Sequence, residues 1–275
     1  MQNIDKKVVD DFGEEWSKFS QSIISESDLK KSWSQYFSIF PFDSLEADSE
    51  GFDMGCGSGR WAKFVAPRVH HLNCIDPSKK ALNVAKKNLS QYKNISFYNA
   101  SVSDATLKKN SQDFGYCLGV LHHIPNTKQG IKDCASLLKK NAPFLLYLYY
   151  NFENRSSLFK ALWKISNLIR KFCSIMPTKF KILLTTIIAY VIYLPLARMS
   201  LILEKLGLNV NNFPLSDYRN KSFYFMKTDS LDRFGTRLEK RFSKDEITEM
   251  LEEGGFKDIQ FSNKMPMWVC ISRKA

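Results

Sequence analysis

The sequence predicts an α/β fold in which helices cover a mostly parallel sheet, and three observations lead to this prediction. Between residues 48 and 150, short apolar segments alternate with segments of helical periodicity, which is the pattern of a parallel sheet. The first apolar segment runs directly into the glycine-rich sequence at 55–59. The alternation returns after residue 230, so we expect the end of the chain to complete the same sheet.

The expected elements follow one another along the chain. Residues 1–47 are expected to be helical, because aromatic side chains such as Trp16 and Trp33 recur at helical spacing until Pro41. Strands are expected at 50–54, 69–75, 95–99, 114–120, 144–150, 256–263 and 268–272. Helices are expected at 60–66, 78–90, 131–138 and 244–253, the last one ending at two consecutive glycines.

The chain is expected to divide into four segments. These are an N-terminal helical lid (1–47), the α/β core (48–150), a helical insertion that is both basic and apolar (151–229), and the C-terminal completion of the core (230–275). Between residues 151 and 227, twelve lysines and arginines stand against three acidic residues, so this segment carries most of the net charge of +12. Such a surface suits nucleic acid, an anionic membrane or an acidic substrate, or is simply solvated.

One stretch of the insertion, 182–196, is almost free of charge and is flanked by Lys179, Lys181 and Arg198. It contains about fifteen apolar residues, fewer than the roughly 20 needed to cross a bilayer. Three interpretations remain open: a buried core or cap helix, an interfacial helix that lies on a membrane, and a membrane span, which its length disfavours.

Composition points to a folded protein of the cytoplasm. The 275 residues are 44% hydrophobic and 25% charged, as in ordinary globular domains. The six cysteines show neither Cys-x-x-Cys spacing nor a histidine at zinc-ligand spacing, so we expect reduced thiols and no metal. The polar N-terminus has no apolar signal-peptide core. We therefore expect a cytoplasmic protein, free or peripheral at the inner face of the membrane.

The glycine-rich turn between a strand and a helix is typical of nucleotide binding, because glycine lets the backbone approach a ligand and the helix start offers amide donors. Arg60 stands where a dinucleotide fingerprint has a third glycine or alanine, and no Gly-Lys-Ser/Thr follows, which excludes a P-loop. Asp53, just before the glycines, suits a cationic amino-acid ligand. Asp76 ends the second strand, where an acid can accept hydrogen bonds from ribose hydroxyls.

Three sequences in order, Asp53–Gly59, Ile75–Ser78 and Gly119–Pro125, resemble the successive motifs of class I S-adenosylmethionine (SAM)-dependent methyltransferases. The resemblance covers about residues 50–150, with a matching tail near 240–275. It implies a Rossmann-like, seven-stranded, mostly parallel sheet with helices on both faces and a reversed last hairpin, to which this chain adds an inserted helical cap. It also implies SAM as the cofactor, bound at the carboxyl ends of the first strands.

The resemblance also assigns cofactor contacts residue by residue. Asp53 with Gly55, Cys56, Gly57 and Gly59 would face the methionine part of SAM; Asp76 with Pro77 would hold the ribose; Asn99 and Ala100 would edge the adenine; and Leu118 and Gly119 would border the sulfonium. Many relatives have an acidic residue near position 99, where this chain has asparagine. The adenine contact therefore departs from the family pattern.

The acceptor site is expected around the ends of the fourth and fifth strands. His122 and His123 follow the fourth strand, and a neutral histidine can accept a proton near pH 7, although the pair can equally shape the loop by packing. Substrate candidates are Tyr149, Tyr150 and Asn151 after the fifth strand, together with Arg219 and Arg233, whose planar guanidinium groups suit carboxylates or phosphates. For the arginines, surface ion pairs are the alternative.

Three functions follow from these features. The first is a methyltransferase that moves a methyl group to an O, N or C atom of a small-molecule or lipid- or glycan-linked acceptor, with an amphiphilic acceptor or an anionic membrane surface meeting residues 151–215. The second is a nucleic-acid methyltransferase, which we do not expect, because Asn-Pro-Pro-Tyr and Pro-Cys motifs are absent and the cations are interleaved with aliphatic residues. The third is a non-catalytic subunit, which the intact glycine-rich loop disfavours.

Overall fold

The structure of the protein is a computed structural model that describes residues 3–18, 26–104, 106–153, 155–210, 213–264, 266 and 268–275. The chain forms two compact units. The first, here called the α/β unit, comprises Met1–Asn154 and Leu238–Ala275. The second, the helical unit, comprises Arg155–Arg237 and contains most of the predicted insertion.

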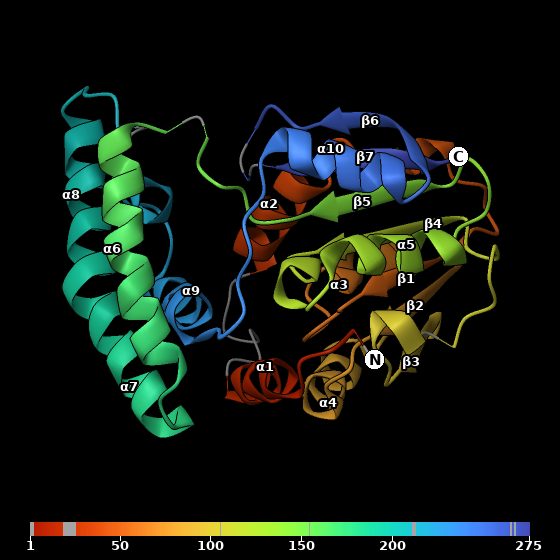
Figure 1. Cartoon of the computed structure of the whole chain (residues 1–275), viewed down its shortest axis with the longest axis horizontal. Coiled ribbons are helices and arrows are strands. Elements are labelled where there is room, and N and C mark those ends of the chain that lie inside the picture. The colour runs from red at the N-terminus through yellow and green to blue at the C-terminus, as the bar shows by residue number, and fades with distance from the viewer. Residues whose placement is uncertain are drawn as a thin grey trace. The chain divides into compact units, whose positions relative to one another are not determined.

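The α/β unit is built on a seven-stranded sheet in the order β3-β2-β1-β4-β5-β7-β6 (Figure 1). The strands are β1 Glu50–Met54, β2 His71–Ile75, β3 Ile95–Tyr98, β4 Phe114–Leu118, β5 Pro143–Tyr147, β6 Phe256–Phe261 and β7 Val269–Lys274. The first five pair in parallel, whereas β7 runs antiparallel to both β5 and β6. The predicted Rossmann-like sheet with a reversed last hairpin is therefore confirmed.

The helices of the α/β unit lie at both ends of the chain and between the strands. They are α1 Lys6–Lys18, α2 Glu26–Tyr36, α3 Ala62–Val65, α4 Lys79–Asn88, α5 Thr127–Leu137 and α10 Lys244–Glu253, with short 3-10 turns at Phe42–Ser44, Ala66–Arg68, Val102–Asp104 and Leu121–His123. Asn126 caps α5 by accepting a hydrogen bond from the Gln129 amide (3.0 Å), so this helix begins four residues before the predicted 131.

The fourth and fifth strands both end earlier than the sequence predicts. The fourth was expected to reach residue 120 but ends at Leu118, because Gly119 takes a positive φ of 80° and leaves the extended conformation. The fifth was expected to reach residue 150 but ends at Tyr147. Both shortened ends lie on the carboxyl edge of the sheet, where irregular backbone replaces strand and opens room for a site.

Helices cover both faces of the sheet. On one face, α5 and α10 contribute Ile131 and Ile247 to a buried cluster that includes Phe52 of β1. On the other face, aromatic side chains from α2 and the turn after it meet the sheet, with the Phe37 ring 5.2 Å from that of Tyr116 and the Phe40 ring 6.0 Å from that of Phe114. Each face therefore buries its own apolar layer.

The helical unit contains α6 Ser157–Ser174, α7 Thr178–Ile188, a π-helical segment Ala189–Tyr193, α8 Leu194–Lys205, a short 3-10 turn Ser216–Tyr218 and α9 Phe223–Gly235. Helices α6 and α7 both pack on α9. Their small core includes Cys173, Ile188, Tyr193, Met226 and Phe234.

Helices α7 and α8 are continuous through the π-helical segment, forming one helix of 28 residues from Thr178 to Lys205. By length and composition alone, this helix is sufficient to cross a membrane. The uncharged stretch 182–196 is thus only the middle of a longer helix, which continues past Lys181 and Arg198. The expectation that its length disfavours a membrane span was therefore wrong.

Replacing Phe52 by alanine should destabilise the α/β unit strongly. The Phe52 side chain is fully buried, with its ring 6.3 Å from that of Phe144, so the change removes packing and leaves a cavity. We expect a loss of about 3–5 kcal/mol in the free energy of unfolding, measured by chemical denaturation. Lys257→Ala on exposed β6 is the control and should change this free energy by less than about 0.5 kcal/mol. Equal effects of the two changes would contradict the packing described.

Candidate functional site

The glycine-rich loop turns the chain sharply at the carboxyl end of β1. Gly55, Gly57 and Gly59 all have positive φ, at 77°, 55° and 77°, a conformation that side chains disfavour. The amides of Gly55 and Cys56 donate to the carbonyl of Ile75 at the end of β2 (2.8 and 3.0 Å). A Cβ on Gly55 would lie 2.4 Å from the Val120 side chain. The loop is thus held tightly against the ends of β2 and β4.

Asp76 ties this loop to the end of β2. One carboxylate oxygen accepts a hydrogen bond from the Gly57 amide (2.9 Å) and the other from the Ser78 amide (2.8 Å). Burial raises the pKa of Asp76 to about 6, and the two amide donors oppose that rise. Each oxygen keeps a second lone pair, as acceptance from two ribose hydroxyls requires. Pro77 follows directly, and Ser78 caps α4 through a bond from the Ala81 amide.

Asp53 is buried on the same edge of the sheet, and its Oδ2 atom has no hydrogen-bond partner among the residues that the structure describes. The hydroxyl oxygen of Ser58, in the loop, is buried in the same way. Burial raises the pKa of Asp53 to about 8; the nearby Tyr116 hydroxyl opposes this shift and the Asp76 charge adds to it. A buried carboxyl with one oxygen left unbonded fits the cationic amino group of SAM, because that cation would supply both the missing hydrogen bond and the opposite charge.

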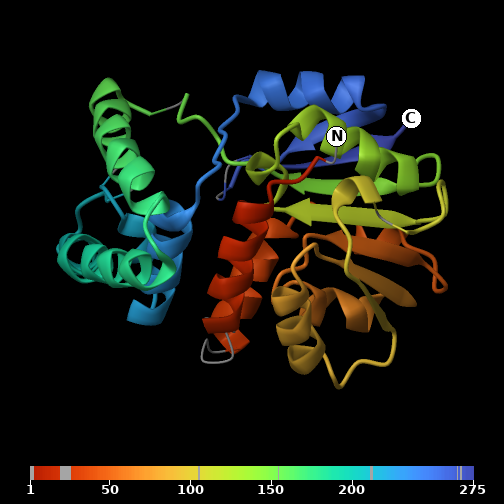
Figure 2. The ribbon, with the colours of Figure 1, turned by 60° about the horizontal axis from the view of Figure 1, so that its bottom comes forward.

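Helix α1 lies beside this loop and against α4 (Figure 2). A Cβ on Gly57 would lie 3.1 Å from the indole nitrogen of Trp16 in α1. The guanidinium of Arg60 lies over the rings of Trp16 (5.5 Å) and Trp61 (4.4 Å), and Lys80 of α4 pairs with Glu14. Helical spacing in the sequence predicted the helix. It did not predict that Trp16 packs against the glycine-rich loop, because this contact joins segments about forty residues apart.

The two residues expected at the adenine lie at the end of β3. The Asn99 side-chain amide donates to the carbonyls of Asp76 (3.1 Å) and Pro77 (2.9 Å), so it supports the turn that presents Asp76. Ala100 is half-buried against the core beneath α5. The asparagine that departs from the family pattern therefore has a definite structural contact. Its contact with adenine stays a prediction.

Leu118 and Gly119 end β4 at the place expected for the sulfonium. The Gly119 amide donates to the Tyr147 carbonyl (3.1 Å), which fixes the backbone between β4 and β5. A Cβ on Gly119 would meet no atom within 4 Å, whereas one on Gly55 or Gly59 would clash. Gly119 therefore borders open space, as a position beside reacting groups requires.

His122 lies in the short turn after β4, and its side chain is fully buried. Its ring stacks on that of Tyr149, with centroids 3.8 Å apart and an interplanar angle of 29°. Neither ring nitrogen has a hydrogen-bond partner in the described part of the chain. Burial lowers the pKa of His122 well below its ordinary value, and the neighbouring His123 and Arg241 add to this effect. The imidazole is thus neutral and retains an acceptor nitrogen at physiological pH.

His123 is held differently. Its Nδ1 lies 2.6 Å from the carbonyl oxygen of Leu238, a geometry in which the ring N–H donates to the carbonyl. Its ring also packs 5.0 Å from that of Phe12 in α1. These contacts support the loop-shaping role that was the alternative to catalysis. The two histidines therefore have different environments, although they are adjacent.

The backbone of residues 238–242 lies alongside His122 and Tyr149 and is hydrogen-bonded to both. The Lys240 amide donates to the carbonyl of His122 (3.1 Å), and the Phe242 amide to the carbonyl of Tyr149 (2.8 Å). Arg241 lies over the Tyr149 ring at 5.0 Å and donates from Nε to the carboxylate of Glu239 (2.9 Å), whose side chain is buried. Sequence reasoning missed Arg241, because only the fold brings this segment to the end of β5.

The three residues predicted after the fifth strand do not act together. Tyr149 joins the histidines, whereas Tyr150 packs on Phe152 (4.7 Å) and Trp268 (6.2 Å). Asn151 is exposed, and its side-chain oxygen accepts a hydrogen bond from the Glu153 amide (3.0 Å). Alternation of side chains along an extended chain separates Tyr149 from Tyr150.

The two predicted arginines belong to the helical unit, and both have partners there. Arg219 binds Glu204 with two hydrogen bonds (2.9 and 2.8 Å) and also donates to the carbonyl of Ser216. Arg233 donates to the Ser166 hydroxyl (3.1 Å). The ion pair that was the alternative for Arg219 is present, with Glu204 as its partner. A role of either arginine in substrate binding stays a prediction.

Replacing Asp53 by asparagine should stabilise the ligand-free protein, and increasingly so as the pH rises. With a pKa near 8, the folded protein keeps a proton that an unfolded aspartate loses near pH 4. The contribution of this carboxyl to stability is therefore full at low pH and declines as the pH rises to about 8. The Asp53→Asn variant does not lose this stability. Its free energy of unfolding should therefore exceed that of the wild type by a growing margin between pH 5 and pH 8, on the order of a few kcal/mol. Thermal unfolding across this range checks it, with exposed Asp43→Asn as the control; parallel pH profiles of wild type and Asp53→Asn would refute it.

Comparison with known proteins agrees with this geometry. Residues 52–146 match the family model described as Methyltransferase domain. The ubiquinone biosynthesis O-methyltransferase of Coxiella burnetii is 29% identical over 107 residues, which are 35% of this chain and 46% of that protein. The chain thus spans less than half the length of this curated relative.

Two solved structures share the fold at low sequence identity. A SAM-dependent methyltransferase of Methanosarcina mazei aligns over 86% of this chain and 98% of its own, with a TM-score of 0.50 and 16% identity. Phosphoethanolamine N-methyltransferase 2 of Haemonchus contortus, solved in complex with SAM, aligns over 94% of this chain and 44% of its own, with a TM-score of 0.51 and 15% identity. The matched domain, the sheet order and the three motifs at its carboxyl edge together show that residues 52–146 form a methyltransferase domain of the class I SAM-dependent type, whose cofactor is SAM.

Proposed function

We propose that this protein transfers the methyl group of SAM to a hydroxyl oxygen of a small amphiphilic acceptor. The observation that carries the proposal is the neutral, fully buried imidazole of His122, stacked on Tyr149 and three residues from the open space at Gly119. An acceptor placed there would lie beside the strand end expected to border the sulfonium. Alignment of acceptor, methyl carbon and sulfur is the main requirement of this reaction.

On the cofactor side, SAM supplies a methyl group made electrophilic by the sulfonium. The Asp53 carboxyl would bind the ammonium of its methionine part through Oδ2, because this buried atom has no hydrogen-bond partner among the described residues. The glycine-rich loop would let its backbone approach the ligand. Asp76, held by the Gly57 and Ser78 amides, would accept hydrogen bonds from the ribose hydroxyls.

On the acceptor side, aromatic rings dominate. Tyr147 lies 5.1 Å from Tyr36 of α2 and 5.9 Å from Tyr149, and Tyr149 in turn stacks on His122. Such a wall favours a flat, apolar acceptor over a sugar or an ion. The acceptor nitrogen of His122 would orient the acceptor hydroxyl and take its proton as the oxygen bonds to the methyl carbon and the C–S bond breaks, releasing S-adenosylhomocysteine. The Coxiella burnetii relative, by its name an O-methyltransferase of ubiquinone biosynthesis, supports an oxygen acceptor.

The alternatives make different predictions. A nucleic-acid methyltransferase would bind RNA with steep salt dependence, yet the cations of the helical unit are interleaved with exposed aliphatic side chains that phosphates do not favour. A non-catalytic subunit would not bind SAM, and the unpaired carboxyl at Asp53 argues against it. A cytoplasmic position stays a prediction.

Two experiments test the proposed function. Isothermal titration with SAM should show binding in the micromolar range, and absence of binding at sub-millimolar SAM would favour the non-catalytic subunit. The protein is then incubated with methyl-labelled SAM and either an organic-solvent extract of cells, an aqueous extract or total RNA. Label should enter the organic-phase fraction in alkali-resistant form, as expected of a methyl ether. Label confined to RNA would overturn the proposal.

Binding of SAM should strengthen as the pH rises from 6 to 8. The cationic ammonium favours the ionised form of Asp53, whose pKa near 8 in the free protein means that binding releases a proton. The dissociation constant should fall by up to about tenfold per pH unit in this range. Titration calorimetry in buffers of different ionisation enthalpy counts the released proton. The Asp53→Asn variant should bind SAM more weakly and lose this pH dependence. A wild-type dissociation constant that does not change between pH 6 and pH 8 would contradict the pairing of Asp53 with the ammonium of SAM.

His122→Phe should reduce methyl transfer without weakening SAM binding. Phenylalanine keeps the ring that stacks on Tyr149 but removes both nitrogens, so we expect the rate of label transfer to fall about 100-fold or more. The dissociation constant for SAM should stay within about twofold of the wild type. Tyr149→Phe, which preserves the stack, is the matched control and should retain most of the activity. Full activity of His122→Phe would exclude this histidine from catalysis.

A further inference from the structure

The helical unit exposes large apolar side chains on a scale that the α/β unit does not. Among the described residues, all sixteen exposed large hydrophobic side chains lie between Leu162 and Leu208. They include Leu168, Val191 and Leu206, which are 66%, 67% and 71% exposed. Scattered single hydrophobics are normal on a protein surface, but a concentration in one unit marks an interaction site.

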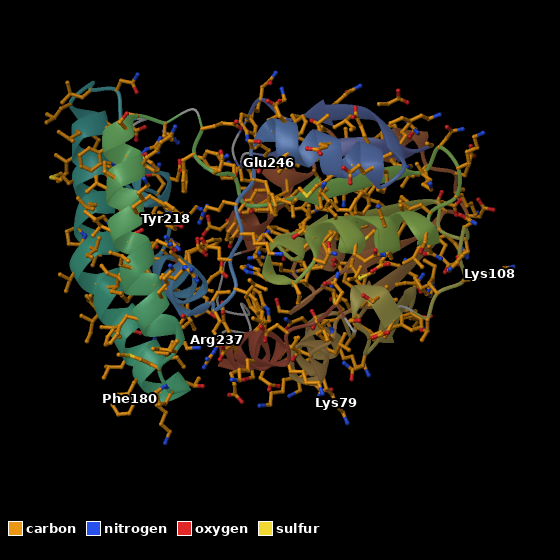
Figure 3. The ribbon with its side chains drawn as sticks, viewed as in Figure 1. Lys79, Lys108, Phe180, Tyr218, Arg237 and Glu246 are labelled. Atoms are coloured by element: carbon orange, nitrogen blue, oxygen red, sulfur yellow. The ribbon has the colours of Figure 1, made fainter. Side chains whose placement is uncertain are left out.

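On the long helix Thr178–Lys205 and the turn after it, these side chains form one line, here called the apolar stripe: Phe180, Leu183, Ile187, Val191, Ile202 and Leu206. Phe180 marks its start, in the first turn of α7 (Figure 3). Phe180 and Leu206 are 26 residues apart, about 7.2 turns of a regular α-helix, which would rotate them about 80° out of line. The π-helical segment Ala189–Tyr193 takes up about one extra residue in its turn. It therefore restores the line to one side of the helix.

Cations follow one flank of this stripe. Lys179, Arg198 and Lys205 are exposed, and each directly precedes an exposed apolar residue of the same helix or of the turn that ends it. Helix α6 repeats the arrangement: Leu162, Ile165, Ile169 and Phe172 are exposed at spacings of three and four residues, beside exposed Lys164 and Lys171. Between residues 155 and 210, nine lysines and arginines stand against one acidic residue, Glu204, which is paired with Arg219.

The opposite side of the long helix is buried and polar in part. Lys181, Thr185 and Ser200 lie there, and the Thr185 carbonyl accepts a hydrogen bond from Ser230 of α9 (2.9 Å). Helix α9 itself carries Lys227, Asp229, Asp232 and Arg233. A helix that crosses a bilayer would carry these groups into hydrocarbon, at high cost. An exposed apolar side flanked by cations, with the opposite side packed on α9, instead suits a helix that lies in the plane of the membrane.

We propose that the helical unit docks on an anionic lipid bilayer through this surface. The apolar stripe and the exposed face of α6 insert among the acyl chains near the headgroups, and Lys164, Lys171, Lys179 and Lys205 contact anionic headgroups. Charge complementarity selects this occupant. A second copy of the chain would place the same cations opposite one another, and like charges in an interface oppose association. The inference is independent of the reaction proposed above.

Flotation of the full-length protein with vesicles tests the docking. Binding to phosphatidylcholine vesicles containing 30% phosphatidylglycerol should be strong at low salt and should weaken at least tenfold at high salt or without phosphatidylglycerol. Ile187→Glu combined with Ile202→Glu should weaken it at least tenfold. Ser90→Glu combined with Gln91→Glu, on exposed positions of the α/β unit, adds the same charge and should have no such effect. Circular dichroism and SAM titration report whether each variant is folded.

A second set of variants tests the cations without touching the stripe. Replacing Lys164, Lys171, Lys179 and Lys205 by glutamine should abolish the preference for anionic vesicles; the same change at Lys79, Lys93, Lys108 and Lys109 of the α/β unit is the matched control, with Lys79 and Lys108 labelled in Figure 3. Absence of binding to anionic vesicles at low salt would overturn the proposal, even if the protein binds SAM and transfers methyl groups. Retention in vesicles after alkaline carbonate extraction would show a span. Stripe variants that dissociate a dimer but still bind vesicles would show that the surface joins two copies.

Discussion

A buried carboxyl group, one oxygen of which has no hydrogen-bond partner among the described residues, is the constraint on which the site depends. Asp53 has a pKa near 8 because the fold removes it from water and offers Oδ2 no hydrogen bond from a described residue. Such a group destabilises the ligand-free protein near neutral pH, so its position is understandable only if a ligand supplies the missing charge. Burial of the Asp53 carboxyl therefore explains both its cost to the stability of the ligand-free protein and its affinity for a cation.

The rest of the cofactor site serves to hold that carboxyl and the loop beside it. Asp76 binds the Gly57 amide, and the Ile75 carbonyl receives the amides of Gly55 and Cys56, so the end of β2 fixes the loop after β1. The parallel register of β1 with β2 places both acids at one edge of the sheet. The charge of Asp76 adds to the burial that raises the pKa of Asp53, and a bound cation would relieve both effects.

The sequence predicts those parts of the molecule that depend on local pattern. The first strand, Glu50–Met54, is found where it was expected, because buried residues run directly into glycines that cannot extend it. The fourth strand was predicted too long. Glycine can adopt either sign of φ, and the positive φ of Gly119 that ends the strand is set by its contacts in the fold. Trp16 and Arg241 could not be predicted, because their roles arise from contacts between distant segments. The long helix was underestimated because Lys181 is buried within the helical unit, where the sequence suggested a solvated end.

Two different solvents explain the two sides of that helix. Its buried side packs on α9 through apolar residues such as Ile188 and Tyr193, whereas its exposed side carries aliphatic residues beside lysines. Water alone would not select an exposed side so rich in apolar groups. The proposed membrane docking accounts for it, because lipid then covers the apolar side. It would also confine the enzyme to the surface where an amphiphilic acceptor accumulates, and confinement raises the effective concentration of the acceptor without any new contact in the active site.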